Sequence, residues 1–470
     1  MPTCNKARCA PIGNPGRPGT AWSRRSVIGA ALSGAAAFGI VPAGAFASRN
    51  GKTISAEDAR ALALGRRDEL VGLLSELVAI RSLSGESAEA AQNVVKNYLS
   101  HLPYRVEESA DRPSRYRDHP EFMPPSPAGY GPFVNVVGWP LDDAPARLAM
   151  FSHIDTHVVE DGWETDPYEA VIKGNRLHGL GVADDKGGVA AMLVAAAALS
   201  EYGGTMPVVM SLHGKGGGSR GSLPVFERIA HAGQSFDAVL YVHPAETERG
   251  LADIKNVVQG ALDLQMTVEG WRGAPLEPMR PDSALWHESG DALSLCLEII
   301  ERLKQGPLAG TEVNVGKLDA GDRTGAVPRR AQANMRVLFG DEHSWTELFA
   351  GVQQELQNVM SSLPSGDGGY RAHIQSTGFR TNAAAVGWDT PFCRALRNSI
   401  EDVTQISPVS YPNHYAGDIR YPMRLLKAPT FGIGSLGGNF YRANEWVDID
   451  DLVNLVAVSI CTMSDWSDLG

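Results

Sequence analysis

Short apolar runs alternate with segments of helical periodicity over residues 133–242, and this alternation limits the fold more than any other feature of the sequence. The strand-like runs are Phe133–Val137, Arg147–Ser152, Val208–Leu212 and Ala238–Val242, and the helical segments are Val189–Leu199 and Val225–Ala232. Neighbouring parallel strands need a long crossover between them, which is usually a helix. The pattern therefore predicts an α/β domain in which helices cover a mostly parallel sheet.

The pattern changes near Gly260. Strand-like and helical segments then follow one another as Leu262–Val268, Ala292–Leu303, Ala331–Phe339, Trp345–Leu363 and Tyr370–Gln375. This set of segments suits a small α+β domain. The first pattern returns with Phe392–Val403, Leu425–Ile433 and Ile449–Met463. We therefore expect a main domain of residues 48–257 and 381–470, interrupted by an inserted domain of residues 258–380.

The first 47 residues have the features of an export signal. Ser23–Ile28 contains the pair Arg24 and Arg25, and an Ala/Gly-rich stretch follows that ends in the small-x-small sequence Ala45–Ala47. This arrangement is typical of a twin-arginine signal peptide, and it predicts a periplasmic or extracellular protein. The alternative is an N-terminal membrane anchor. No other segment is apolar enough to predict a membrane span, so we expect none after processing.

The charge of the chain excludes some partners. The sequence has 42 basic and 54 acidic residues, and five of the basic residues lie in residues 1–47, where there is no acidic residue. The rest therefore carries 37 basic and 54 acidic residues, a formal charge near −17. Nucleic acids and anionic membranes repel such a protein, so we expect a small-molecule or peptide-like substrate and no nucleic-acid partner.

Two segments carry side chains that suit metal chemistry. His153 and Asp155 close a strand-like run, and residues two apart on a strand face the same way. A carboxylate there can orient an imidazole whose other nitrogen binds a metal ion. Gly179–Gly188 follows, with Asp184 and Asp185 just before a helix. Neither the G-x-G-x-x-G nor the P-loop order of glycines is present, so the carboxylate pair is more informative than the glycines.

These segments resemble the M-twenty metallopeptidases. The resemblance is carried by Ser152–Thr156, Gly162–Tyr168, Gly181–Gly188, Ala416–Arg420 and Asn444–Val447, and it covers about residues 65–465. That family includes glutamate carboxypeptidase, acetylornithine deacetylase, succinyl-diaminopimelate desuccinylase and carnosine-type dipeptidases. The resemblance implies a di-zinc catalytic domain interrupted by a lid domain that often dimerises, which here correspond to the main and inserted domains.

The resemblance also implies roles for particular residues. His153 would be a zinc ligand, Asp155 the residue that orients it, and Asp184 the carboxylate that bridges two zinc ions. His243 aligns with a further ligand that is an acid in most members and a His in some amidohydrolase branches. Together His153, Asp184 and His243 form one complete zinc site.

Three positions depart from the family pattern, and they concern the other zinc ion and the general base. Lys215 stands where the family has its catalytic Glu, Gly216 where it has a ligand, and Tyr441 where it has a ligand His. We therefore expect at most one Zn²⁺ or similar divalent ion, and a metal-free site remains an alternative. Lys215 and the nearby His213 are the candidate bases, and Tyr441 is a third candidate for acid–base work.

The lid departs from the family too. Gly270–Pro275 has no His at the carbonyl-polarising position, and Gly325 replaces an Asn. Arg336 matches a lid arginine that commonly binds a substrate carboxylate; otherwise it is a solvated strand arginine.

The sequence thus favours a hydrolase that acts on a C–N bond of a small amino-acid-derived substrate, in which standard di-zinc catalysis is not expected. Two alternatives stay open. One is a repurposed cyclase or lyase-type enzyme that uses Lys215, His213, His243 and Tyr441 without zinc. The other is a non-catalytic protein that binds an amino-acid-like ligand through Arg336, Lys215 and the glycine-rich loop at a helix start. A homodimer formed through the lid is expected from the resemblance alone.

Overall fold

The computed structural model describes residues 54–124, 131–141, 147–203, 205–270, 290–322, 326–363, 369–411, 414–415 and 417–467. Residues Ser48–Gly470 form one compact unit. The expected signal peptide and the lid positions Trp271–Pro275 and Gly325 lie outside the described residues. Within the described part of the chain, no helix has both the length and the apolar character that crossing a membrane requires.

An eight-stranded sheet forms the catalytic domain's centre. Its strands lie in the order β1 (Tyr104–Asp111), β2 (Phe133–Pro140), β6 (Val208–Leu212), β3 (Leu148–His153), β7 (Ala238–Val242), β16 (Thr430–Ile433), β8 (Asp253–Lys255) and β14 (Val409–Tyr411). The central strands β6, β3, β7 and β16 pair in parallel and are buried throughout.

The expectation of a mostly parallel sheet therefore holds at the centre, but the sheet as a whole is mixed. β1 pairs antiparallel with β2, and β2 with β6. The described residues between β1 and β2 form only the short 3-10 helix η1 (Pro113–Tyr116), so there is no helical crossover that would return the chain in the parallel sense. The predicted run Leu425–Ile433 divides into the end of a π-helical turn, η3 (Pro422–Leu426), and β16.

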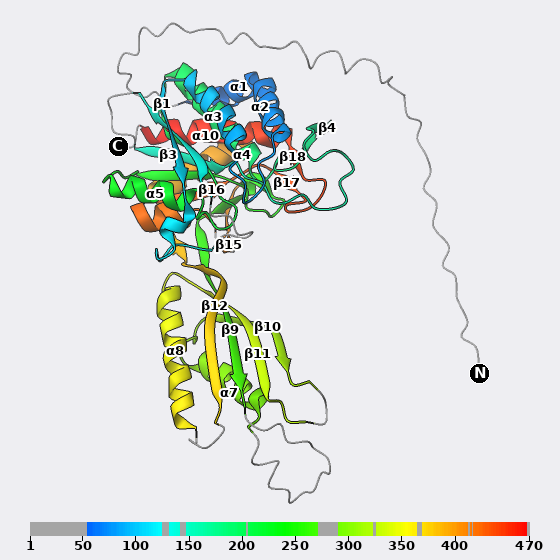
Figure 1. The fold of residues 1–470 in the computed structure, drawn as a ribbon. Coiled ribbons are helices and arrows are strands. Elements are labelled where there is room, and N and C mark those ends of the chain that lie inside the picture. Colours follow the sequence, from blue (N-terminus) through cyan, green and yellow to red (C-terminus); the bar gives the residue numbers. More distant parts are fainter. Residues whose placement is uncertain are drawn as a thin grey trace, which may run out of the picture. The chain divides into compact units, whose positions relative to one another are not determined.

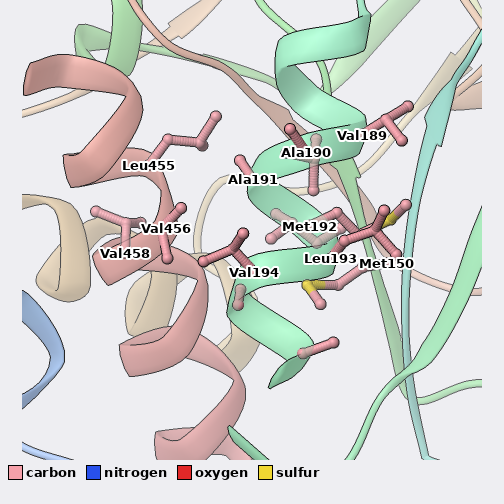
Figure 2. Packing of buried hydrophobic residues seen from close by; sticks show 14 of the residues in the cluster. Met150, Val189, Ala190, Ala191, Met192, Leu193, Val194, Leu455, Val456 and Val458 are labelled. Atoms are coloured by element: carbon pink, nitrogen blue, oxygen red, sulfur yellow. The ribbon is translucent and has the colours of Figure 1, made fainter. Parts of the chain in front are cut away.

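Helices cover both faces of this sheet (Figure 1). On one face α4 (Lys186–Tyr202) lies between the sheet and α10 (Ile449–Ser467), which explains why α4 is buried from Lys186 to Leu199. Figure 2 shows residues of this core, among them Ala190 and Ala191 of α4 and Leu455 and Val456 of α10. The same face carries α1 (Ala56–Gly65), α2 (Arg67–Ala79), α3 (Glu89–Ser100) and α9 (Pro391–Thr404), and the other carries α5 (Ser222–His231).

The lid is an antiparallel sheet with two helices, an arrangement that agrees with the α+β character predicted from the sequence. Its main strands lie in the order β10 (Glu312–Ala320), β11 (Arg330–Phe339), β9 (Val257–Glu269) and β12 (Arg371–Thr381). Helices α7 (Ala292–Gln305) and α8 (Trp345–Ser362) pack on it around a separate apolar core. The sequence pattern missed β10 because most of its residues are exposed, which leaves no apolar alternation to detect.

A small third sheet flanks the segment that carries Tyr441. It consists of β17 (Gly437–Gly438), β18 (Trp446–Asp448), β5 (Arg176–His178) and β4 (Val171–Lys173). The remaining short elements are η2 (Gly250–Ala252), β13 (Ala384–Ala385) and β15 (His414–Tyr415), and the last two pair with β9.

The packing of α4 generates a stability prediction. Leu193 is fully buried in the core shown in Figure 2, so Leu193→Ala removes buried methyl groups and leaves a cavity. We expect the free energy of unfolding, measured by urea denaturation, to fall by about 2–5 kcal/mol. Leu64 on α1 is 64% exposed, and Leu64→Ala should change stability by less than about 0.5 kcal/mol. Equal effects of the two substitutions would contradict this description of the core.

Candidate functional site

The candidate metal ligands meet at the carboxyl edge of the parallel strands. His153 is the last residue of β3, and His243 directly follows β7, which pairs with β3 in parallel. Asp184 lies in the turn that leads into α4. Ligand sites of open α/β sheets form at this edge because the strands end there together.

Three ligand atoms converge on one point. The Nε2 atoms of His153 and His243 lie 3.1 and 3.2 Å from Oδ1 of Asp184, and the centres of the two imidazole rings are 5.1 Å apart. All three side chains are buried, and this Oδ1 atom has no hydrogen-bond partner among the described residues. Two imidazoles and a carboxylate are a donor set that fits Zn²⁺ or a similar divalent ion. The structure therefore brings close together the three side chains that the sequence analysis grouped. It also places Asp185 near the two histidines, with which it forms another group of candidate metal ligands.

The other ring nitrogens of the two histidines face carbonyl oxygens. Nδ1 of His153 is 2.9 Å from the backbone oxygen of Asp155, and Nδ1 of His243 is 2.7 Å from that of Pro244. A carbonyl can accept only from a protonated nitrogen, so this arrangement leaves the Nε2 lone pair of His153 free to bind a metal ion. The same holds for His243 when its Nδ1 donates to Pro244 and does not accept from Lys255.

Nearby charges act differently on the two histidines. Burial and Lys215 lower the pKa of His153, but Asp184 outweighs them and raises it to about 9. Burial and then Lys255 lower the pKa of His243 to about 3. Nζ of Lys255 is 2.6 Å from Nδ1 of His243, and burial lowers the pKa of Lys255 to about 8. A metal ion must therefore compete with a proton on His153 but not on His243.

Asp155 acts on this site differently from the expectation. Its carboxylate is 3.6 Å from Nδ1 of His153, too far for the expected hydrogen bond. Instead it accepts the backbone N–H groups of Gly214 at 2.8 Å and Lys215 at 3.1 Å. Asp155 therefore orients His153 through its backbone oxygen and fixes the glycine-rich loop through its carboxylate.

Glu445 holds the Asp184 turn in place, a role that the sequence analysis did not assign. Its buried carboxylate accepts the N–H groups of Gly181 and Ala183 at 2.8 Å and that of Asp184 at 2.9 Å. Three such bonds fix the backbone from which the Asp184 side chain extends. The motif Asn444–Val447 contains Glu445 and could have indicated a role for it, but the sequence alone does not show which groups this carboxylate binds.

Lys215 forms an ion pair with the second oxygen of Asp184. Its Nζ atom contacts Oδ2, and its side chain is only 10% exposed. Burial lowers the pKa of Lys215, but Asp184 and Glu246 outweigh burial, so the pKa is raised above its usual value. An ammonium has no lone pair with which to accept a proton. This geometry therefore suits a fixed cation and not the general base that the sequence analysis considered.

The loop that carries Lys215 is held by two buried arginines. Gly216, Gly217 and Gly218 have φ angles of 78°, 74° and 70°, a conformation that favours glycine. Arg220 donates to the backbone oxygen of Lys215 at 3.2 Å, and Arg420 donates to that of Gly217 at 2.8 Å. These bonds position the loop against the ligand cluster.

His213, the other candidate base, is buried away from the cavity. Its Nδ1 atom is 3.3 Å from Oδ1 of Asn135, and its ring packs edge-on against Phe133. Burial lowers the pKa of His213. Because His213 does not line the cavity described next, it has no direct access to a substrate there.

A cavity of about 570 Å³ opens beside the ligand cluster. His153, His243 and Lys215 line it, and Gly378 and Phe379 from β12 bring the lid to its wall. The other lining residues are mostly aromatic, acidic or glycine, among them His157, Tyr241, Glu246, Tyr411, Asp418 and Tyr441. A cleft of this size with a few charged groups suits a small molecule.

Glu246 is a site residue that the sequence analysis missed. Its carboxylate accepts a hydrogen bond of 2.6 Å from the hydroxyl of Tyr441, and oxygen atoms of Glu246 and Asp184 lie within 4.8 Å of a nitrogen of His243 and of one another. Glu246 and Tyr441 have φ angles of 63° and 62°, which few residues other than glycine adopt. The sequence could have indicated Glu246, because this acidic residue lies only three positions after the candidate ligand His243.

Arg336 does not line the cavity. Its guanidinium forms two hydrogen bonds to the carboxylate of Asp263, at 2.7 and 2.8 Å, and lies 4.8 Å from the ring centre of Phe379. Its immediate contacts are therefore within the lid, where it supports Phe379, and the expected contact with a substrate carboxylate remains a prediction.

Comparisons with known sequences identify the group to which these features belong. A family model described as peptidase family M20/M25/M40 matches residues 149–465. A succinyl-diaminopimelate desuccinylase of Gluconacetobacter diazotrophicus is 27% identical over 351 residues, which cover 69% of this chain and 86% of the relative. The desuccinylase of Gluconobacter oxydans is 25% identical over 331 residues, covering 68% of this chain and 81% of the relative.

Solved structures show the same fold at low sequence identity. Aminopeptidase PepT of Bacillus cereus has a TM-score of 0.61 at 16% identity, covering 85% of this chain and 98% of its own. Human carnosine dipeptidase 1 has a TM-score of 0.58 at 14% identity, with coverage of 88% and 100%. A dinuclear metal-binding peptidase of Bacillus subtilis has a TM-score of 0.57 at 11% identity, with coverage of 86% and 99%.

Proposed function

The chain belongs to peptidase family M20/M25/M40, and from this premise we propose that it hydrolyses an amide bond of a small amino-acid-derived substrate with a single divalent metal ion. As a family member it is a metallohydrolase, a class that acts on amide bonds. The observation that carries the finer proposal is the convergence of His153, Asp184 and His243 on one point, with the second oxygen of Asp184 engaged by Lys215.

Each part of the site has a task in this reaction. When bound, the metal ion would act as a Lewis acid toward the amide carbonyl and toward water. His153, Asp184 and His243 hold it, and Asp155 and Glu445 fix the backbone around them. The aromatic wall, including Phe379 of the lid, would shield one side of a bound substrate from bulk water.

The reaction also needs a proton acceptor, and we assign this role to Glu246. A water molecule that attacks an amide must lose a proton, and a carboxylate at the cavity wall can take it. Glu246 lines the cavity, and Tyr441 holds its carboxylate through the hydroxyl group. Neither Lys215, which is an ammonium, nor His213, which is behind the wall, is placed for this task.

The cavity favours a substrate of the size of a dipeptide or an acylated amino acid. Relatives and structural neighbours named desuccinylase, aminopeptidase and dipeptidase support this class. A metal-free reaction in the same cleft is the second candidate, because the Lys255 amine lies 2.6 Å from Nδ1 of the ligand His243. That contact can turn the imidazole lone pair away from a metal ion.

Metal content tests the proposed function first. The purified chain, dialysed against trace zinc, should hold one zinc ion, and His153→Ala or His243→Ala should reduce this below about 0.2 per chain because each removes one of the three ligands. Elemental analysis measures the content, and release of free amine from N-succinyl amino acids, N-acetyl amino acids and dipeptides measures turnover. Chelation should abolish that turnover. Turnover that survives in zinc-free protein would favour the metal-free candidate and contradict the proposal.

Glu246→Gln tests the proton acceptor. The amide keeps the size and the hydrogen bond with Tyr441 but accepts a proton poorly, so kcat should fall by about 10²–10⁴ while KM and zinc content stay unchanged. Glu248→Gln is the control, because Glu248 lies on the same loop with a φ of 58° but is exposed and does not line the cavity. A kcat loss of less than threefold in Glu246→Gln would remove Glu246 from this role.

We further propose that the twin-arginine pathway exports the protein to the periplasm or beyond. The support is Arg24 and Arg25 ahead of the Ala/Gly-rich stretch. Replacing both by Lys keeps the charge but removes the paired guanidinium groups, so the chain should remain inside cells. Fractionation with an antibody measures this, and a chain exported equally well after the change would contradict the proposal.

A further inference from the structure

We propose that the Lys215 ammonium is a built-in cation that occupies the place of a second metal ion beside Asp184. The inference rests on the proposed single-metal function. It goes beyond that function by assigning the positive charge at Oδ2 of Asp184 to Lys215. In this view two cations flank the Asp184 carboxylate, one a bound metal ion and the other the ammonium group of Lys215.

The two oxygens of the Asp184 carboxylate have different surroundings. Oδ1 faces the Nε2 atoms of His153 and His243 at 3.1 and 3.2 Å. Oδ2 contacts Nζ of Lys215. A carboxylate can bind one cation at each of its two oxygens. Here the residues around Oδ1 suit a metal ion, and the Lys215 ammonium neutralises Oδ2.

The residues around Lys215 suit an ammonium and do not suit a metal ion. Nζ lies 4.6 Å from the ring centre of Tyr441, within the range of a cation–π contact. Both groups of candidate metal ligands found among the described residues include His243, which belongs to the Oδ1 side. Among the described residues, a second ion would therefore have to share His243 with the first.

The position of Lys215 is fixed at both its backbone groups. Its N–H is bonded to Asp155 and its carbonyl oxygen to Arg220, so the side chain extends from a held backbone. A lysine that is held, nine-tenths buried and paired with a carboxylate cannot leave to admit a metal ion without breaking these contacts.

This arrangement has a chemical consequence. An ammonium carries one charge and three hydrogen-bond donors but has no coordination position for water. Lys215 lines the cavity, so it can stabilise a negatively charged substrate oxygen while the proton acceptor comes from elsewhere, as assigned to Glu246. Its positive charge also repels the metal ion on the Oδ1 side, which gives a measurable effect that requires no substrate.

Zinc binding by the full chain and its variants tests the inference, with stoichiometry and affinity measured by competition with a chromogenic chelator. Lys215→Met keeps most of the stem but removes the charge, and the first zinc ion should bind at least tenfold more tightly. Lys215→Arg keeps the charge and should match the wild type within threefold. Lys173→Met removes the charge of a lysine that is exposed and does not line the cavity, so it should also match the wild type.

A second comparison asks whether Lys215 excludes the second ion. Tyr441→His adds an imidazole at a left-handed position that His tolerates better than most residues, and alone it should still give one zinc ion per chain. Lys215→Glu combined with Tyr441→His replaces the ammonium by two ligands and should give two.

Three results would overturn the inference: two zinc ions in the wild type, two in Tyr441→His alone, or unchanged zinc affinity in a folded Lys215→Met. Failure of the proposed function gives a different pattern. If the wild type binds no zinc while Lys215→Met binds one, the single-metal hydrolase fails and the built-in cation stands.

Discussion

The carboxylate of Asp184 is the interaction on which the rest of the site depends. One oxygen faces two imidazoles and the other faces an ammonium, so a single buried side chain connects β3, the end of β7, the glycine-rich loop and α4. Such a carboxylate is stable in a buried place only when its charge is compensated and its backbone is fixed. Lys215 compensates much of the charge of Asp184, and Glu445 fixes the backbone by binding the turn that carries Asp184.

The fold explains why these groups meet. Parallel strands end together, so residues that close β3 and follow β7 lie side by side although they are far apart in the chain. The alanine-rich helix α4 packs tightly between the sheet and α10, which places its first turn under the ligand cluster. The lid contributes Phe379 to the cavity wall, and Arg336 contacts the ring of this residue.

The family to which the chain belongs includes dinuclear enzymes, but this chain distributes charge differently at the same edge of the sheet. In the function proposed above, Lys215 neutralises one oxygen of Asp184 and Glu246 accepts the proton, so two side chains carry these two tasks. Lys215 and Tyr441 also contact each other, because the ammonium lies over the ring of Tyr441, whose hydroxyl donates to the carboxylate of Glu246.

The sequence by itself determined the alternation of the central strands and helices and the α+β character of the inserted segment, because these depend on local periodicity. The grouping of His153, Asp184 and His243 came from the family resemblance, which rests on motifs of fixed spacing. Only the tertiary structure decided the protonation and partners of Lys215, the burial of His213, the use of the Asp155 backbone oxygen, and the entry of Glu246 and Phe379 into the cavity wall. Those properties arise from desolvation and from contacts between segments that are distant in the sequence. The residues next to a position along the chain predict neither of these.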